Sequence, residues 1–310
     1  MSRVPLPALA LAAVMLMWSS SFVVIRHIVA FVEPAPMAEG RLLVGSVVLV
    51  TLWSWRFRSR VATALPRGRT LWLTVGYGAL WFALYTVLVN AAEQHLDAGT
   101  TALLVNIAPI VVAVLAGTFL REGFPPLLVV GIAVSFAGAA VIALAGPGRH
   151  DMLGVALAVV AALLYGISVV AQKLVLRDAD ALTATALGCL VGALVLLPYA
   201  PRLWNELAAG PVSATVGVVY LGLAPTALAF LLWAYALAHT PAGVTASSSY
   251  AVPALSILGS WAFLSETPSA VGLAGGALCL AGVAIARLPR RRRRAVMTGT
   301  DIKATVDVSD

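Results

Sequence analysis

The chain has 310 residues, of which 61% are hydrophobic and 11% are charged, and its mean hydropathy is +0.97. A soluble domain has roughly 45–50% apolar and about 25% charged residues, so this composition excludes a soluble globular protein. The net charge of +7 could suggest nucleic acid as a partner. The basic residues instead follow the loops between apolar runs, so no nucleic-acid partner is expected.

Apolar segments fill almost the whole length, and each is long enough to cross a bilayer, which takes about 20 residues. They leave no room for a water-soluble catalytic domain. Cys189 and Cys279 lie among apolar neighbours, so we expect packing residues rather than redox or metal ligands. In chain order, the ten predicted spans are residues 7–31, 36–55, 71–92, 98–119, 125–145, 152–173, 181–200, 213–237, 243–264 and 269–288.

The placement of the basic residues predicts the orientation in the membrane. If ten helices alternate across the bilayer, sixteen of the 20 Lys and Arg residues fall on one side and four on the other. Cytoplasmic loops carry the excess of Lys and Arg, so both termini are predicted to be cytoplasmic. The run at 290–294 could also contact anionic lipid head groups, but a topological anchor is the simpler interpretation.

An internal repeat organises the chain. His95–Ala140 returns 144 positions later as His239–Ala284, so that Pro109 falls on Pro253. Each copy holds five spans, and because five is odd, the second copy enters from the opposite side of the membrane. The predicted fold is therefore an all-α integral membrane protein with ten transmembrane helices in two inverted five-helix repeats, an architecture of alternating-access transporters. The predicted units are residues 1–147, 148–288 and a basic, disordered cytoplasmic tail, 289–310.

Several short motifs stand out, and one of them is echoed in the second copy. They are Trp18-Ser19-Ser20-Ser21-Phe22, Arg41, Ala98-Gly99 with Pro109 and Phe119-Leu120-Arg121-Glu122, and the later Phe263-Leu264-Ser265-Glu266. These motifs resemble the drug/metabolite transporter superfamily, specifically its EamA-type ten-helix permeases, over residues 8 to 288. The resemblance implies a bacterial inner-membrane permease or exporter of small metabolites, often amino acids or related polar compounds.

Polar and aromatic residues in the third span predict part of a solute-binding site, since polar groups inside a bilayer usually face the interior of the helix bundle. Tyr77, Trp81 and Tyr85 are spaced i, i+4 and i+8, so in an α-helix they form one aromatic stripe. Such a stripe can line a solute path through stacking and cation–π contacts. Ordinary packing is the open alternative.

Matching positions in the first and sixth spans extend the candidate site. Trp18 and Ser21 align with Tyr165 and Ser168, and Gln172 lies one turn further on the same face. A site between two repeats requires polar groups at equivalent depths in both. The alternative for the serines is a hydrogen bond to a local carbonyl.

Two matched prolines mark the fourth and ninth spans. Pro109 and Pro253 each free a carbonyl about one turn earlier, so the predicted helix kinks could bring Asn106, Ser248 and Tyr250 to the solute. A kink that only shapes the bundle is the alternative.

Arg41 and Trp233 complete the predicted solute-binding residues. The Arg41 guanidinium can bind a solute carboxylate with its fork of donors. It could equally pair with Glu39 or reach the interface.

Enzyme signatures are absent from the sequence: it has no Gly-rich phosphate loop, no metal-spaced His or Cys cluster and no nucleophile elbow. We therefore expect no enzyme, no cofactor and no metal, but a monomeric or weakly dimeric secondary transporter of a small organic solute. The alternatives are a flippase-like carrier of an amphipathic molecule, and a membrane sensor or assembly factor, which predicts a sealed apolar core. Because every acidic residue falls in a loop or near a span end, transport is expected to follow the solute's own gradient.

Overall fold

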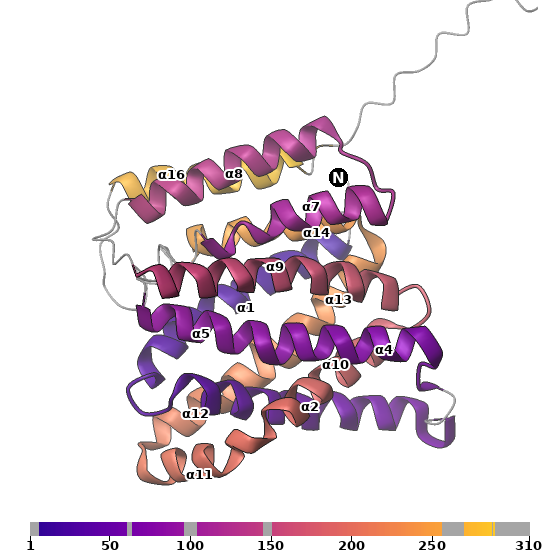
Figure 1. Cartoon of the computed structure of the whole chain (residues 1–310), viewed down its shortest axis with the longest axis vertical. Coiled ribbons are helices and arrows are strands. Elements are labelled where there is room, and N and C mark those ends of the chain that lie inside the picture. The colour runs from indigo at the N-terminus through magenta and orange to yellow at the C-terminus, as the bar shows by residue number, and fades with distance from the viewer. Residues whose placement is uncertain are drawn as a thin grey trace, which may run out of the picture.

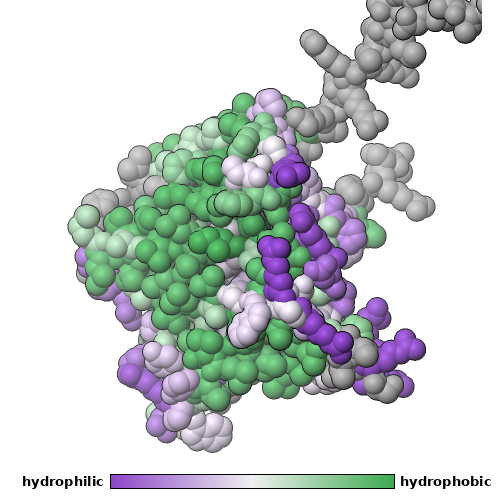
Figure 2. Space-filling view, turned by 45° about the vertical axis from the view of Figure 1, so that its right-hand side comes forward, coloured by the Kyte–Doolittle hydropathy of each residue, from purple (hydrophilic) through white to green (hydrophobic). Residues whose placement is uncertain are grey.

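The computed structural model describes residues 6–60, 64–95, 104–144, 151–255, 270–286 and Leu288. Helices and turns make up this part of the chain, and it contains no strand. The helices lie side by side in stacked layers, with α8 and α16 at one end of the stack and α11 and α12 at the other (Figure 1). Hydrophobic residues cover most of the face in Figure 2, and hydrophilic residues gather at its edges, as a protein embedded in a bilayer requires.

The first half supplies five membrane segments. They are α1 (Leu6–Ile28), α2 (Pro34–Phe57), the continuous α4–η2–α5 (Gly68–Tyr77, Gly78–Tyr85, Thr86–His95), α7 (Ala108–Phe119) and α8 (Pro126–Leu144). The short 3-10 helix η1 (Arg58–Arg60) follows α2. Ala98-Gly99 of the sequence motif lies outside the described residues.

The second half repeats this order. Its segments are α9 (Met152–Val175), α10 (Ala181–Leu196), the continuous α12–η4–α13 (Val212–Leu221, Gly222–Leu228, Ala229–His239), α14 (Ala242–Ser247) with η5 (Ser248–Tyr250), and α16 (Ala270–Ala286). Between α10 and α12 lie η3 (Leu197–Tyr199) and α11 (Ala200–Ala209). Phe263–Glu266 and the tail 289–310 lie outside the described residues.

Five of these helical segments are long and apolar enough to cross a membrane: Pro34–Phe57, Gly68–Ala92, Met152–Val175, Ala181–Ala209 and Val212–His239. Shorter apolar helices account for four further spans, at Leu6–Ser21, Ala108–Phe119, Pro126–Val141 and Ala270–Ala286. Together with α14 and η5, they give the predicted ten-span order within the described part of the chain.

The contact between α8 and α16 shows that the repeats are inverted. A Cβ atom on Gly131 would lie 2.6 Å from the carbonyl oxygen of Gly282, and one on Gly138 would lie 2.6 Å from that of Gly275. Gly131 and Gly138 correspond to Gly275 and Gly282 at the offset of 144. The two equivalent helices therefore run antiparallel and exchange partners about a pseudo-two-fold axis, which confirms the predicted architecture. Glycine at these positions lets the two backbones approach closely.

A second symmetric feature interrupts the third and eighth spans. The π-helices η2 and η4 begin at Gly78 and Gly222, which are 144 residues apart. Each glycine accommodates a neighbouring backbone: a Cβ on Gly78 would lie 2.7 Å from the Gly188 oxygen, and one on Gly222 would lie 2.9 Å from the Arg41 oxygen. In η4, Pro225 also removes a backbone donor, which favours a widened turn.

Candidate solute-binding site

Five aromatic residues from both halves meet between α1, η2, α9 and α13. We call Trp18, Trp81, Tyr165, Phe230 and Trp233 the central aromatic cluster. The Trp81 ring centroid lies 5.1 Å from those of Tyr165 and Phe230 and 5.8 Å from that of Trp233, and the Trp18 and Trp233 centroids are 5.1 Å apart. These are tilted and edge contacts that aromatic rings favour. Four of the five residues were predicted from sequence.

Unpartnered polar atoms concentrate around this cluster. Among the described residues, the buried side-chain nitrogen and oxygen atoms without a hydrogen-bond partner belong to Glu39, Tyr165, Ser168, Gln172, Trp233 and Tyr250. Five of these six residues were nominated from the sequence. A buried polar group without a partner costs about 1–3 kcal/mol, so native proteins keep few of them. Tyr165 and Trp233 belong to the cluster, Ser168 and Gln172 follow Tyr165 along α9, and Tyr250 lies near Tyr165, whereas Glu39 lies apart in α2.

Neighbouring hydroxyls do not satisfy these groups. The Ser249 hydroxyl lies near Tyr165, but it donates to the carbonyl oxygen of Ala246 at 2.8 Å. The Tyr77 hydroxyl lies near Gln172, and it donates to the carbonyl oxygen of Ala184. Neither the Tyr165 hydroxyl nor the Gln172 amide has a hydrogen-bond partner among the described residues.

Arg41 lies beside the cluster rather than at an interface. Its Nε donates a hydrogen bond of 2.9 Å to the Thr226 hydroxyl of η4, and Tyr85 lies nearby. The expected alternative of a pair with Glu39 is not formed, because neither Glu39 oxygen has a partner among the described residues. A hydroxyl does not neutralise a guanidinium, so this positive charge is free to attract a carboxylate.

The predicted aromatic stripe is split. Tyr85 faces Tyr165, with ring centroids 5.8 Å apart, but Tyr77 packs against α10, where its hydroxyl bonds to Ala184. The reason is η2, which starts directly after Tyr77: its i→i+5 hydrogen bonds widen the turn, so a spacing of four no longer keeps side chains on one face. Tyr77 therefore lies outside the central aromatic cluster but near Gln172, and its role in solute binding stays a prediction.

Two of the three predicted serines, Ser21 and Ser248, satisfy their hydroxyls locally, whereas the Ser168 hydroxyl has no partner among the described residues. Ser21 donates to the Trp18 carbonyl at 2.6 Å, and Ser248 donates to the Val244 carbonyl at 3.3 Å. The Trp18 indole reaches across to the Pro225 carbonyl at 3.2 Å. The two serines thus follow the structural alternative, whereas Trp18 joins the two halves.

Each matched proline lies just after an interruption of its helix. A turn at Asn106 and Ile107 separates the helical residues 104–105 from α7, whose first turn contains Pro109. Pro253 lies in a helical stretch that follows η5. The Tyr250 ring packs against Leu128 and Ile132 of α8 and also lies near Tyr165.

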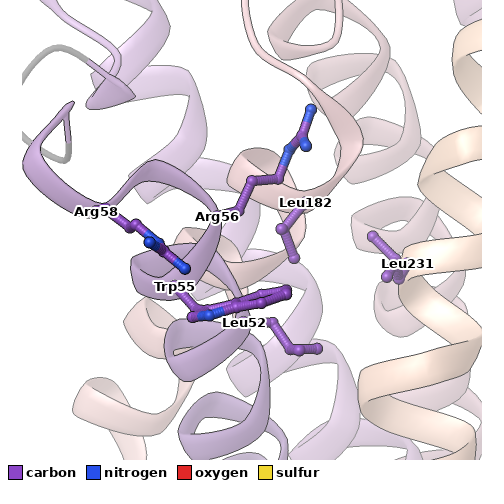
Figure 3. A pocket seen from close by; sticks show the side chains of 6 residues that line it. All are labelled: Leu52, Trp55, Arg56, Arg58, Leu182 and Leu231. Carbon is purple, nitrogen blue, oxygen red and sulfur yellow. The ribbon is translucent and has the colours of Figure 1, made fainter.

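The cluster is closed in this conformation. Trp81 is 1% exposed, Trp233 is 0% exposed and Tyr165 is 5% exposed. A surface groove of about 400 Å³ at the end of α2 contains none of the predicted site residues; Leu52, Trp55, Arg56, Arg58, Leu182 and Leu231 line it (Figure 3). The closed centre is mainly aromatic, and it also contains the unpartnered polar atoms of Tyr165 and Trp233.

Two charged residues close one end of the bundle. Lys173 of α9 donates to the carbonyl oxygen of Leu237 at the end of α13 and to that of Thr240 at 2.6 Å. Glu122 accepts the Ala242 amide at 2.7 and 3.0 Å. A cation at a helix C-terminus and a carboxylate at a helix N-terminus are both favourable. Glu122 follows α7 in the chain, and it caps α14 of the other half.

Sequence reasoning missed Thr226, Pro225, Phe230 and the burial of Glu39. Pro225 carried a signal, because a proline inside an apolar span frees a carbonyl, as argued for Pro109. Thr226 and Phe230 carried none, since their role depends on which turn of η4 faces Arg41 and Trp81.

The comparisons agree with this architecture. The model of the EamA-like transporter family matches residues 6–144 and 152–288. A probable terminal-alkyne amino-acid exporter of Streptantibioticus cattleyicolor is 34% identical over 292 residues, covering 94% of this chain and 97% of that protein. The uncharacterized transporter YdfC of Bacillus subtilis is 31% identical, covering 86% of each.

A solved crystal structure shares the fold at a TM-score of 0.74 and 22% identity, over 92% of this chain and 98% of that one. The duplicated family match and the transporter names of the relatives identify a multi-pass membrane transporter rather than an enzyme, and the antiparallel pair α8 and α16 agrees with the duplication. The chain belongs to the EamA-like transporter family.

Proposed function

We propose that this protein exports a small amino-acid-like metabolite across a bacterial inner membrane by alternating access, with both termini in the cytoplasm. The observation that carries the proposal is the group of unpartnered polar atoms around the central aromatic cluster. A solute that carries both charged and apolar parts would satisfy these atoms and occupy the aromatic surface. The name of the Streptantibioticus relative, a probable terminal-alkyne amino-acid exporter, supports the same solute class.

Each part of the site suits one part of such a solute. Arg41 provides the only nominated cation, and its fork matches a carboxylate. The Tyr165 hydroxyl and the Gln172 amide can accept hydrogen bonds from an ammonium group, and nearby aromatic faces add cation–π attraction. The Trp81 and Phe230 rings, 5.1 Å apart, would pack against the solute side chain.

The repeat supports the transport cycle. We assign residues 1–147 and 148–288 as the two five-helix units and 289–310 as a cytoplasmic tail. Exchange of conformations between inverted units turns a site that opens to one side into a site that opens to the other. Release of the Lys173 and Glu122 contacts would open the end that they close.

The alternatives lack a matching observation. A flippase needs a lateral opening that reaches the site, but the apolar hollow between α2 and α10 is lined by none of the predicted residues. A sensor or assembly factor gains nothing from buried polar atoms that cost stability.

Removal of one hydroxyl tests the proposed site. Tyr165→Phe deletes an atom that makes no hydrogen bond within the described part of the protein, so thermal stability should stay the same or rise. Solute affinity, measured by tryptophan fluorescence of Trp18, Trp81 and Trp233, should fall about tenfold, the equivalent of one lost hydrogen bond. Tyr199→Phe, at an exposed tyrosine, is the matched control. Unchanged affinity in Tyr165→Phe would contradict the assignment.

A further inference from the structure

One buried polar residue has no part in the proposed site. Glu39 lies in the second turn of α2, is 0% exposed, and neither of its carboxylate oxygens has a hydrogen-bond partner among the described residues. Its position near the start of a span is as predicted, but close packing removes it from water.

Tight packing of α2 produces this burial. Met37 and Ala38 next to it are buried, and Gly40 has no side chain to separate α2 from α11 and α12. A Cβ on Gly40 would lie 2.6 Å from Val218 and 3.1 Å from Leu203. The glycine thus allows the helices to seal the neighbourhood of the carboxyl group.

No described charged or titratable group on the elements packed against α2 compensates Glu39. Arg41 donates to Thr226, the Cys189 thiol bonds to the Leu42 carbonyl, and Arg202 is engaged with Glu33 and Glu206. The remaining such groups on α2 and these elements are Arg56, Arg58, Arg60, Tyr77, Tyr85, His95, Tyr199 and Tyr220, and none is within ion-pair or hydrogen-bond distance of the carboxylate.

A charged carboxylate without a partner is very costly in such a place, whereas a protonated carboxyl group is much less so. We propose that Glu39 is the proton-binding group that couples solute export to inward proton movement. This inference rests on the proposed export function, and it adds the driving ion. Each cycle adds one proton from external water to a Glu39 oxygen and releases one to cytoplasmic water, while the solute crosses in the opposite direction.

The route from one side is short. Glu33, at the N-terminal end of α2, is exposed and forms an ion pair with Arg202. Glu39 lies six positions after Glu33, which corresponds to about 9 Å along the helix axis. A small movement of α11 or α12 away from Gly40 would therefore admit water to Glu39 from that side.

Two assays in proteoliposomes with clamped voltage test the coupling. Solute counterflow at equal pH measures exchange alone, and uptake driven by a pH gradient measures coupling. At one-to-one exchange, the concentration ratio of the solute at equilibrium equals that of the protons. A gradient of one pH unit should therefore sustain about tenfold accumulation of the solute. Glu39→Gln should keep counterflow and lose this accumulation. Glu33→Gln, at the exposed carboxylate, should keep both.

A chemical measurement covers the case in which Glu39→Gln does not fold. Dicyclohexylcarbodiimide modifies protonated carboxyl groups in apolar surroundings, so in the wild-type protein it should label Glu39 more at low pH, as detected by mass spectrometry of the peptides. Absence of this label would overturn the inference, as would gradient-driven accumulation retained by Glu39→Gln. Counterflow without any effect of the pH gradient would reject the coupling alone. Absence of counterflow in every variant would reject the export function instead.

Discussion

Ser135 and Cys279, which are 144 residues apart, bond to each other's backbone. The Ser135 hydroxyl donates to the Cys279 carbonyl at 3.0 Å, and the Cys279 thiol donates to the Ser135 carbonyl at 3.4 Å. The offset between them equals the repeat offset, so the pseudo-two-fold axis passes between these two residues. The contact also gives Cys279 a structural role that agrees with its prediction as a packing residue.

Glycine at this interface should be essential for packing. In Gly138→Ala the new methyl group would lie 2.6 Å from backbone atoms of Gly275 and Cys279, so the helices must separate. We expect a loss of about 1–3 kcal/mol, the usual cost of overpacking, seen as a lower melting temperature in detergent. Gly76→Ala is the control, since nothing lies within 4 Å of its Cβ and helix propensity improves. Equal melting temperatures for the two variants would contradict the close approach.

Trp53 and Trp233 allow a structural indole to be compared with a proposed solute-binding indole. The Trp53 indole donates to the Thr183 hydroxyl at 3.0 Å, whereas the Trp233 indole has no partner within the described residues. Trp53→Phe should therefore cost about 1 kcal/mol more stability than Trp233→Phe. Trp233→Phe should reduce solute affinity, and Trp53→Phe should not. The reverse pattern in chemical denaturation and fluorescence titration would place the solute elsewhere.

Arg41 should discriminate carboxylates from amides. The wild-type protein should bind an amino acid more tightly than its amide by about 10- to 100-fold, the range for a hydrogen bond to a charged group. Arg41→Gln should abolish this preference while it leaves the amide's affinity similar. Arg56→Gln, in the surface groove, is the control. A preference that survives Arg41→Gln would remove this residue from the site.

Asp151 should stabilise the protein only above acidic pH. Its carboxylate accepts the Leu153 amide at the start of α9 at 3.0 Å and bonds to His95 at 2.7 Å, and these contacts lower the pKa of Asp151. Because the pKa of Asp151 is lower in the folded protein than in the unfolded chain, its contribution to folding stability is fully present above the ordinary aspartate pKa. This contribution disappears as the pH falls through the pKa of Asp151 in the folded protein. Asp151→Ala should thus have a lower melting temperature than the wild type near neutral pH, and this difference in melting temperature should disappear in acid. A gap independent of pH would contradict the assigned contacts.

Reporter fusions test the orientation. A reporter after Lys303 should be active only inside the cell, and one inserted at Gly148 only outside; both points lie beyond the described residues. The expectation rests on the sixteen-to-four distribution of Lys and Arg. Activity of both reporters on one side would be incompatible with an odd number of spans between them.

The repeat made the architecture predictable from sequence. Matched glycines such as Gly131 and Gly275 indicated the duplication. The odd number of five spans per copy then predicted that the two copies are inverted. Four of the five members of the central cluster were predictable because polar and aromatic side chains inside a bilayer usually face the interior of the bundle. Tyr165, Gln172 and Trp233 were found in this way.

Side-chain direction and burial were less predictable. Tyr77 departs from the aromatic stripe because η2 is a π-helix, and the amino-acid sequence of η2 does not predict this type of helix. Glu39 is desolvated by neighbours of Gly40 that are more than 160 positions away in the chain, and Glu122 caps a helix of the other half. Such features depend on how segments meet in space, so residue spacing alone does not report them.

Counterflow of a radiolabelled amino acid into proteoliposomes tests the proposed transport most directly. Vesicles loaded with a panel of neutral amino acids, including ones with apolar or unsaturated side chains, should accumulate external label transiently when they contain the wild-type protein. Tyr165→Phe should slow this exchange, while Tyr199→Phe should not. Counterflow equal to that of protein-free vesicles for every amino acid tested would contradict transport of this solute class.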